Sequence, residues 1–98
     1  MARKIYISGP ISGHNPDIVR VRFATAMKAF ENGPFEPVSP LENGLPDTAT
    51  YDEHMLRDLE MLSECSAIYM LKGWRYSRGA RLEFKIAKNL GFKIIYEH

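Results

Sequence analysis

Short apolar runs rich in β-branched and aromatic residues alternate with helical patterns along this chain, and this alternation constrains its fold more than any other feature. The runs predict four strands, at residues 4–8, 35–38, 67–71 and 92–96. Strands separated by helices generally pair in parallel through right-handed crossovers. We therefore predict an α/β domain in the order βαβαβαβ, a small three-layer, Rossmann-like or flavodoxin-like arrangement with a four-stranded parallel sheet.

Start and stop signals frame each helical segment. In the first, Asn15 is a capping residue and Pro16 suits the first helical position. Thr50 and Glu53 form a capping box at the start of the second. The third is predicted for residues 77–90 and is closed by a glycine.

Composition and charge limit the classes of function. The 98 residues are 45% apolar with a net charge of +1, which fits one compact domain over residues 1–98. The Lys and Arg residues are scattered, so we expect no polymeric nucleic acid as a partner. No apolar stretch predicts a signal peptide or a membrane span, and the lone Cys65 can form no internal disulfide, so we expect a cytoplasmic protein. Because a short enzyme often completes its pocket with a second copy, we expect a homodimer or a higher homo-oligomer.

In open parallel sheets, ligands bind beyond the carboxyl ends of the strands. Here this edge holds the strand exits 8–13, 38–39 and 71–79. The first exit lacks the spacing of a Walker A loop or a dinucleotide fingerprint, yet its glycines and hydroxyls can bring backbone N–H groups close to an oxyanion or a sugar. A tight turn explains its glycines equally well. The candidates in this exit are Ser8, Gly9, Pro10, Ser12 and Gly13.

Glu83 is the most informative single residue. On the third helix, positions 79/80, 83, 86/87 and 90 form one stripe, and Glu83 is its only charged member. A carboxylate thus takes a core position near the helix start, at the ligand-binding edge of the sheet. An interaction with the helix dipole, or a pair with an arginine, would also explain it. We favour a functional role, because a buried acid in a cleft is a usual catalytic arrangement.

Three further residues near this edge are weaker candidates. Asp58 follows His54 by one helical turn, and periodicity alone favours a solvated surface acid. Trp74 can stack on a flat ligand ring, although packing explains it as well. Ser77 can cap the third helix and bind a phosphate at the same helix terminus.

Cysteine and metal chemistry find no support in the residue spacing. His54 and Cys65 lie about 16 Å apart if the second helix continues between them at about 1.5 Å per residue. The three histidines fall at no metal-ligand spacing with Cys65 or with one another. We therefore expect neither a metal nor a cofactor.

Over almost its whole length, the chain resembles the nucleoside 2-deoxyribosyltransferase-like superfamily, and most closely its small, often phage-associated branch (domain of unknown function 4406). The resemblance rests on residues 4–13, 55–59 and 70–74, and above all on Ser77-Arg78-Gly79-Ala80-Arg81-Leu82-Glu83. The family's Gly-x-x-x-Glu pattern falls on Gly79 and Glu83.

This resemblance implies that Glu83 attacks the anomeric carbon of a nucleoside or nucleotide, and that Asp58 assists near the sugar and the leaving base. It implies a retaining mechanism, with a covalent glycosyl-enzyme that water or a second base resolves. Ser77 stands where related nucleotide hydrolases have Ser, which favours a nucleoside 5′-monophosphate as the substrate. Arg78 and Gly79, which follow it, are further ligand candidates.

One departure from the family pattern lowers the expected activity, because Ser66 stands where relatives usually have Asp. A second hypothesis is therefore a protein that binds a nucleotide, or a signal derived from one, in the same cleft without turnover. A scaffold with a vestigial pocket is a third.

Overall fold

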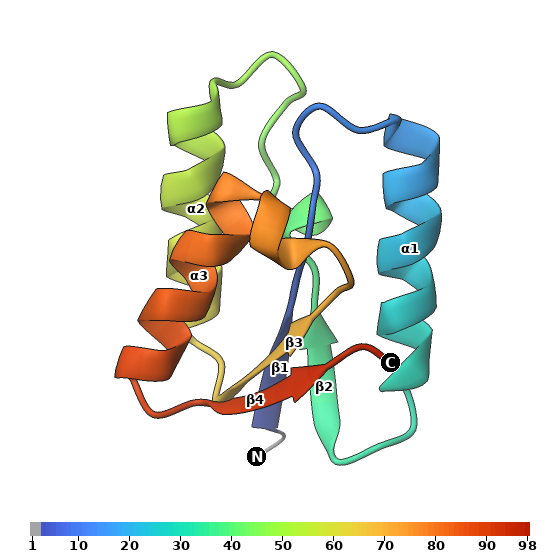
Figure 1. The fold of residues 1–98 in the computed structure, drawn as a ribbon, viewed down its shortest axis with the longest axis vertical. Helices are drawn as coiled ribbons and strands as arrows, with labels where there is room; N and C mark the ends of the chain where they lie inside the picture. Colours follow the sequence, from blue (N-terminus) through green and yellow to red (C-terminus); the bar gives the residue numbers. More distant parts are fainter. Residues whose placement is uncertain (1–2) are drawn as a thin grey trace.

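The computed structural model describes residues 3–98 as four strands and three α-helices in strict alternation (Figure 1). The strands are all parallel and lie in the order β2-β1-β3-β4. This confirms the predicted α/β class and the order βαβαβαβ. The elements are β1 (Arg3–Ser8), α1 (Pro16–Ala29), β2 (Phe35–Val38), α2 (Tyr51–Ser63), β3 (Ala67–Met70), α3 (Arg78–Asn89) and β4 (Lys93–Tyr96).

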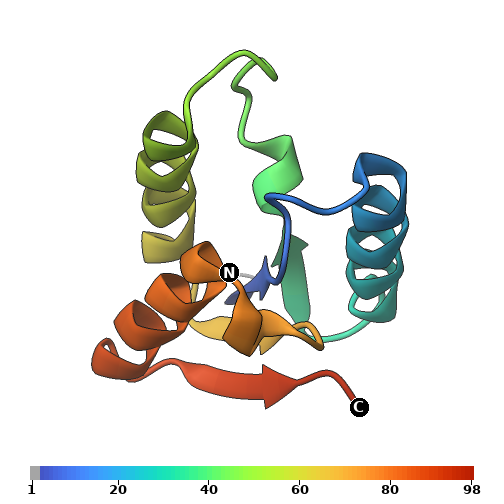
Figure 2. The ribbon, with the colours of Figure 1, turned by 45° about the horizontal axis from the view of Figure 1, so that its top comes forward.

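The sheet is the middle layer of three. Helix α1 covers one face, and α2 and α3 cover the other (Figure 2). We call these the α1 face and the α2/α3 face. The α1 face is packed by Ile7, Val19, Phe23, Ala26 and Leu71. The α2/α3 face is packed by Tyr6, Leu62, Cys65, Ile68, Met70, Ala80 and Ala87.

The predicted helix starts are made by side-chain caps. The Asn15 side chain accepts the N–H of Asp17 at 2.9 Å. Thr50 and Glu53 form the reciprocal capping box. The distance is 2.9 Å from the Thr50 nitrogen to Glu53 Oε1 and 3.1 Å from the Glu53 nitrogen to Thr50 Oγ1. These caps satisfy N–H groups that have no partner within the helix.

The structure differs from the sequence-based expectation at three places. Two segments predicted as irregular contain short 3₁₀ helices, η1 (Pro40–Glu42) and η2 (Trp74–Tyr76). Helix α3 ends at Asn89, and Leu90 is 58% exposed instead of completing the buried stripe. The reason is geometric, because Gly91 turns the chain with a φ of +77° and directs it into β4 before another helical turn can form.

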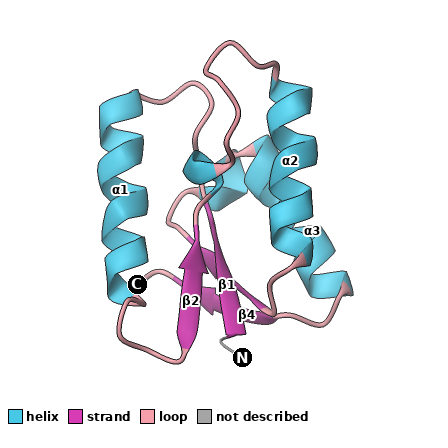
Figure 3. Ribbon diagram, turned by 180° about the vertical axis from the view of Figure 1, so that it is seen from behind, coloured by secondary structure: helices cyan, strands magenta, loops and turns pink. Residues whose placement is uncertain are grey.

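Strand order decides where a ligand can bind. From β1 the chain crosses to β2 on one side, whereas β3 lies on the other side of β1. The exits of β1 and β3 therefore diverge, which leaves a crevice beyond their carboxyl ends. Figure 3 shows α1 and α2 standing on either side of this end of the sheet. None of the helices within residues 3–98 has the length and apolarity of a membrane span.

Candidate active site

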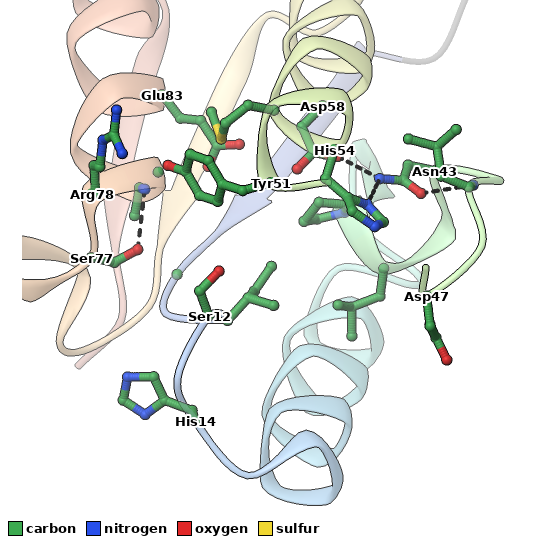
Figure 4. Close-up of a pocket in the computed structure, with 18 of the residues that line it drawn as sticks. Ser12, His14, Asn43, Asp47, Tyr51, His54, Asp58, Ser77, Arg78 and Glu83 are labelled. Carbon is green, nitrogen blue, oxygen red and sulfur yellow. Dashed lines mark hydrogen bonds between the residues drawn. The ribbon is translucent and has the colours of Figure 1, made fainter. Parts of the chain in front are cut away.

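A cavity of about 440 Å³ opens beyond the carboxyl edge of the sheet (Figure 4). Its walls come from the β1 exit, from residues 39–49, which contain η1 and which we call the η1 loop, and from the first turns of α2 and α3. The structure brings seven of the predicted residues to this cavity, namely Gly9, Ser12, Asp58, Ser77, Arg78, Gly79 and Glu83.

Glu83 lies in the second turn of α3 and is only 5% exposed. The Tyr6 hydroxyl donates to Oε2 at 2.6 Å, and the Ser8 hydroxyl donates to Oε1 at 2.7 Å. Because side chains alternate along a strand, Tyr6 and Ser8 share the face of β1 that α3 covers. Ser8 was predicted as a ligand contact, but it is fully buried, does not line the cavity, and instead contacts the Glu83 carboxylate. The carboxylate is thus held at both oxygens while it borders the cavity.

Burial sets the protonation of this carboxyl. Loss of water raises the pKa of Glu83 from 4.5 to about 7. The hydrogen bonds donated by Tyr6 and Ser8 lower it, and the charge of Asp58 raises it further. A carboxyl that titrates near neutral pH is populated both as a nucleophilic anion and as an acid.

Asp58 is buried on α2, with 6% of its surface exposed. The solvated surface acid that periodicity favours is therefore wrong, because the η1 loop folds over this part of the helix. The Asn43 side-chain amide donates to Asp58 Oδ1 at 2.9 Å. Burial raises the pKa of Asp58 to about 6, while the hydrogen bond from Asn43 and the neighbouring His54 and Arg57 side chains lower it.

The start of α3 forms the outer wall of the cavity. The Ser77 hydroxyl oxygen accepts the N–H of Ala80 at 3.2 Å, which leaves its own O–H available to a ligand. The Arg78 guanidinium lies 5.3 Å from the centre of the Tyr51 ring. A helix N-terminus with a hydroxyl and a guanidinium beside it favours an anionic group.

Two glycines allow the walls to approach each other. A Cβ on Gly9 would lie 2.7 Å from the Leu71 Cβ, so the β1 exit packs directly on the end of β3. A Cβ on Gly79 would lie 3.1 Å from the Met55 sulfur, where α3 meets α2. Both glycines shape the cavity through packing.

Three further predicted residues do not line this cavity. Trp74 stacks on Phe84 with ring centroids 4.5 Å apart, so it packs against α3. Pro10 is buried and lies near Gly73. Gly13 turns the chain with a φ of +80°. Packing and backbone geometry account for all three, and we leave them out of the proposed ligand contacts.

Sequence reasoning missed residues that the tertiary structure brings in. Tyr6 lies in the strand predicted at residues 4–8, and its spacing of two from Ser8 is the signal that both side chains face the same helix. Asn43 carried no signal beyond its position in a long loop. Tyr51 lines the cavity from the first residue of α2. Within residues 3–98, no three His, Cys, Asp or Glu side chains gather closely enough to hold a metal ion.

Comparison with known proteins adds a family and a fold. The family model described as domain of unknown function (DUF4406) matches residues 3–96. No curated protein matches the chain. Among solved structures, the 2-desoxiribosyltransferase from Leishmania mexicana superposes with a TM-score of 0.74 at 20% sequence identity. The match covers 96% of this chain and 63% of that one, so this chain spans less than two-thirds of that protein's length.

Proposed function

The chain belongs to the DUF4406 family and has a nucleoside 2-deoxyribosyltransferase-like fold, and we propose that it cleaves or exchanges the N-glycosidic bond of a nucleoside 5′-monophosphate. One observation carries the proposal: a buried carboxyl, Glu83, borders the cavity with two hydroxyl donors behind it and a second buried carboxyl, Asp58, on the neighbouring helix. A retaining displacement at a sugar carbon uses two carboxyl groups, one as the nucleophile and the other as acid and base, and this pair supports that assignment.

In the first step, an oxygen of ionised Glu83 forms a bond to C1′ while the bond from C1′ to the base nitrogen breaks. The proton of Asp58 moves to the departing base. In the second step, water or another base attacks C1′ on the face that the first base left. Its proton returns to Asp58, and Glu83 is released as a carboxylate.

The two hydroxyl donors give Glu83 its orientation. Tyr6 and Ser8 each fix one carboxylate oxygen, which limits rotation about the last side-chain bond. Holding a nucleophile close to its attack geometry removes much of the entropic cost of the reaction. The same bonds favour the anion, which must form before attack.

The phosphate end of the substrate belongs at the start of α3. Ser77 offers a hydroxyl proton, Arg78 offers a guanidinium, and the helix offers unpaired N–H groups. The base end then lies toward Asp58 and the η1 loop.

A panel of ribo- and deoxyribonucleoside 5′-monophosphates, with free base measured by chromatography, tests this function. We expect base release with at least one substrate and a loss of more than about 10³-fold in Glu83→Gln, which keeps the shape but removes the nucleophile. Glu31→Gln, on the surface after α1, is the matched control. Base release that persists in Glu83→Gln would remove Glu83 from the mechanism.

Binding without turnover is the second candidate function. It is favoured by the full hydrogen bonding of Glu83, because a purely structural buried carboxylate would be held in the same way. The same panel separates the two, since a ligand that binds only the folded state raises the melting temperature. Stabilisation with no free base from any substrate would select this candidate.

We also propose that the protein acts as a homodimer through the groove between α2 and α3. Leu56 is 66% exposed and Leu82 is 41% exposed in this groove. Tyr51 and Arg78 line both the groove and the cavity, so a second copy would extend the cavity wall. Light scattering should give a dimer for the wild type and a monomer for Leu56→Asp. Val21→Asp on α1, at 65% exposure, is the control.

A further inference from the structure

Asn43 makes four hydrogen bonds, three of which join the η1 loop to α2, and it is only 6% exposed. Its Oδ1 accepts the N–H of Leu45 at 3.0 Å. Its Nδ2 lies 2.9 Å from Asp58 Oδ1 and 3.0 Å from His54 Nδ1. Its backbone oxygen accepts from Arg57 Nε at 3.1 Å. Figure 4 shows Asn43 next to the side chains of His54 and Asp58.

The backbone of Leu45 settles which end of the Asn43 amide is oxygen. A backbone N–H can only donate, so the atom that faces it must be the acceptor Oδ1. The opposite atom is then the NH₂ group, which has two protons and no acceptor capacity. Each proton has one partner, Asp58 Oδ1 and His54 Nδ1.

This orientation determines the form of the His54 ring. A nitrogen that accepts from an NH₂ group must present its lone pair, so Nδ1 carries no proton. The ring is then neutral, and its proton is on Nε2. Because His54 lines the cavity, this N–H is the ring donor that remains for a ligand.

The same orientation distinguishes the two oxygens of Asp58. Oδ1 accepts a hydrogen bond from the Asn43 amide. Within residues 3–98, this is the only hydrogen bond that the Asp58 side chain makes. A proton on Oδ1 would oppose the amide proton that already points at it. The carboxyl proton therefore resides on Oδ2.

We propose that Asn43 is a positioning residue, which holds His54 as a neutral Nε2–H donor and leaves Oδ2 as the oxygen through which Asp58 exchanges its proton with the substrate. The first half of the proposal, the neutral form of His54, follows from the hydrogen bonds alone. The second half, proton exchange through Oδ2 of Asp58, rests on the proposed glycosidic reaction.

The charged and titratable groups that face Asp58 come from three elements. His54 and Arg57 act on it from α2, Glu83 from α3 and Tyr6 from β1. A positively charged His54 would give Asp58 a favourable charge, but it would place a ring proton against the Asn43 amide protons. The hydrogen-bond geometry therefore favours the neutral ring.

Nitrogen-15 NMR of the histidine rings at neutral pH tests the first half without any substrate. We expect His54 in the wild type to show a protonated Nε2 and a bare Nδ1, and Asn43→Ala to show a mixture of the two neutral forms. His14, which is exposed on the loop after β1, is the internal control and should not change. A protonated Nδ1 in the wild type, or no change at His54 in Asn43→Ala, would overturn the proposal.

Asn43→Asp tests the second half. The new carboxylate keeps an acceptor for Leu45, removes both donated hydrogen bonds and places a like charge beside Asp58. Both changes favour a protonated Asp58, so the pH optimum of base release should move upward by about half a unit or more, with kcat affected more than KM. Equal loss at every pH would indicate a structural role and overturn this half. Absence of turnover in the wild type would count against the glycosidic reaction and overturn this half with it, while the NMR result still decides the first half.

Discussion

The two faces of the sheet differ in chemistry, although neighbouring side chains of the same strand, β1, contribute to both. On the α1 face, Ile7 packs with Val19 and Phe23 of α1 in an entirely apolar cluster. On the α2/α3 face, the neighbours of Ile7 in β1 are Tyr6 and Ser8, and both donate to the buried Glu83. Strand alternation alone separates the two sets.

This difference indicates that the α1 face contributes to folding stability, whereas the α2/α3 face includes a carboxyl whose burial is unfavourable. Burial of apolar side chains on the α1 face stabilises the fold and does not depend on hydrogen-bond partners or on protonation. The buried Glu83 carboxyl on the α2/α3 face loses its hydration. Its anion is stable only to the extent that protein hydrogen bonds replace the lost water. We therefore expect substitutions on the α1 face to act on folding, and substitutions around Glu83 to act on pH dependence and chemistry.

Phe23→Ala should give the largest effect on stability. Phe23 is 1% exposed at the centre of the α1 face, and its truncation should destabilise the fold by about 3–5 kcal/mol in denaturant unfolding. Val21→Ala, on the exposed side of the same helix, should stay within about 0.5 kcal/mol. Comparable losses in both variants would contradict the assignment of this face to the core.

The pH dependence of stability should come from the α2/α3 face. The pKa of Glu83 is raised in the folded state from 4.5 to about 7, so its contribution is present at acid pH and is lost as the pH rises through about 7. Asp58 acts in the same direction, and its contribution is lost as the pH rises from its ordinary pKa of 3.8 to about 6.

Glu83→Gln should remove the part of this dependence that comes from Glu83, while the part from Asp58 remains. It should stabilise the protein above pH 7 by on the order of 3 kcal/mol, because a neutral side chain is not penalised by burial. Urea unfolding from acid to alkaline pH measures it, with Glu31→Gln as the control. An unchanged slope in Glu83→Gln would assign the pH dependence to other groups.

Tyr6→Phe should have a smaller effect, confined to the α2/α3 face. It removes the 2.6 Å hydrogen bond to Glu83, which should raise the pKa of Glu83 and lower stability above pH 7 by about 1.5–3 kcal/mol. Tyr69→Phe, beside the apolar cluster of the α1 face, is the matched control and should cost less than about 0.5 kcal/mol. Carboxyl NMR shifts of Glu83 would report the change in pKa directly.

Gly13→Ala, in the loop that leads from β1 to α1, should have the smallest effect. No atom lies within 4 Å of the position of the new Cβ, so only the φ of +80° opposes it, at about 1 kcal/mol. Ligand binding should be unchanged, since Gly13 does not line the cavity. A loss of binding without a loss of stability would place this loop in the site.

Local signals were sufficient for the elements of the fold. The Asn15 and Thr50 caps, the β-branched strands and Gly91 predicted element starts and ends that the structure reproduces, apart from the short 3₁₀ helices and the exposed Leu90. These features depend on neighbours in sequence, which periodicity and capping preferences describe well.

The site was predictable only in part. Glu83 was visible because a charge interrupts a helical stripe, whereas periodicity placed Asp58 on the surface, and the η1 loop covers it. Trp74 was a candidate ring for ligand stacking, and its stack on Phe84 depends on how α3 lies against its own entry loop. Such placements follow from packing between segments that are distant in sequence, and the residues next to each position give no signal of it.

By itself, the sequence determined the strand and helix order, the buried position of Glu83 on α3 and the carboxyl edge at which the cavity opens, because these depend on periodicity and on the handedness of crossovers. Only the tertiary structure decided that Tyr6 and Ser8 hold Glu83, and that Asn43 contacts both His54 and Asp58 at one cavity. The physical reason is that these contacts join segments up to 77 residues apart, and their hydrogen bonds form only after the layers have packed.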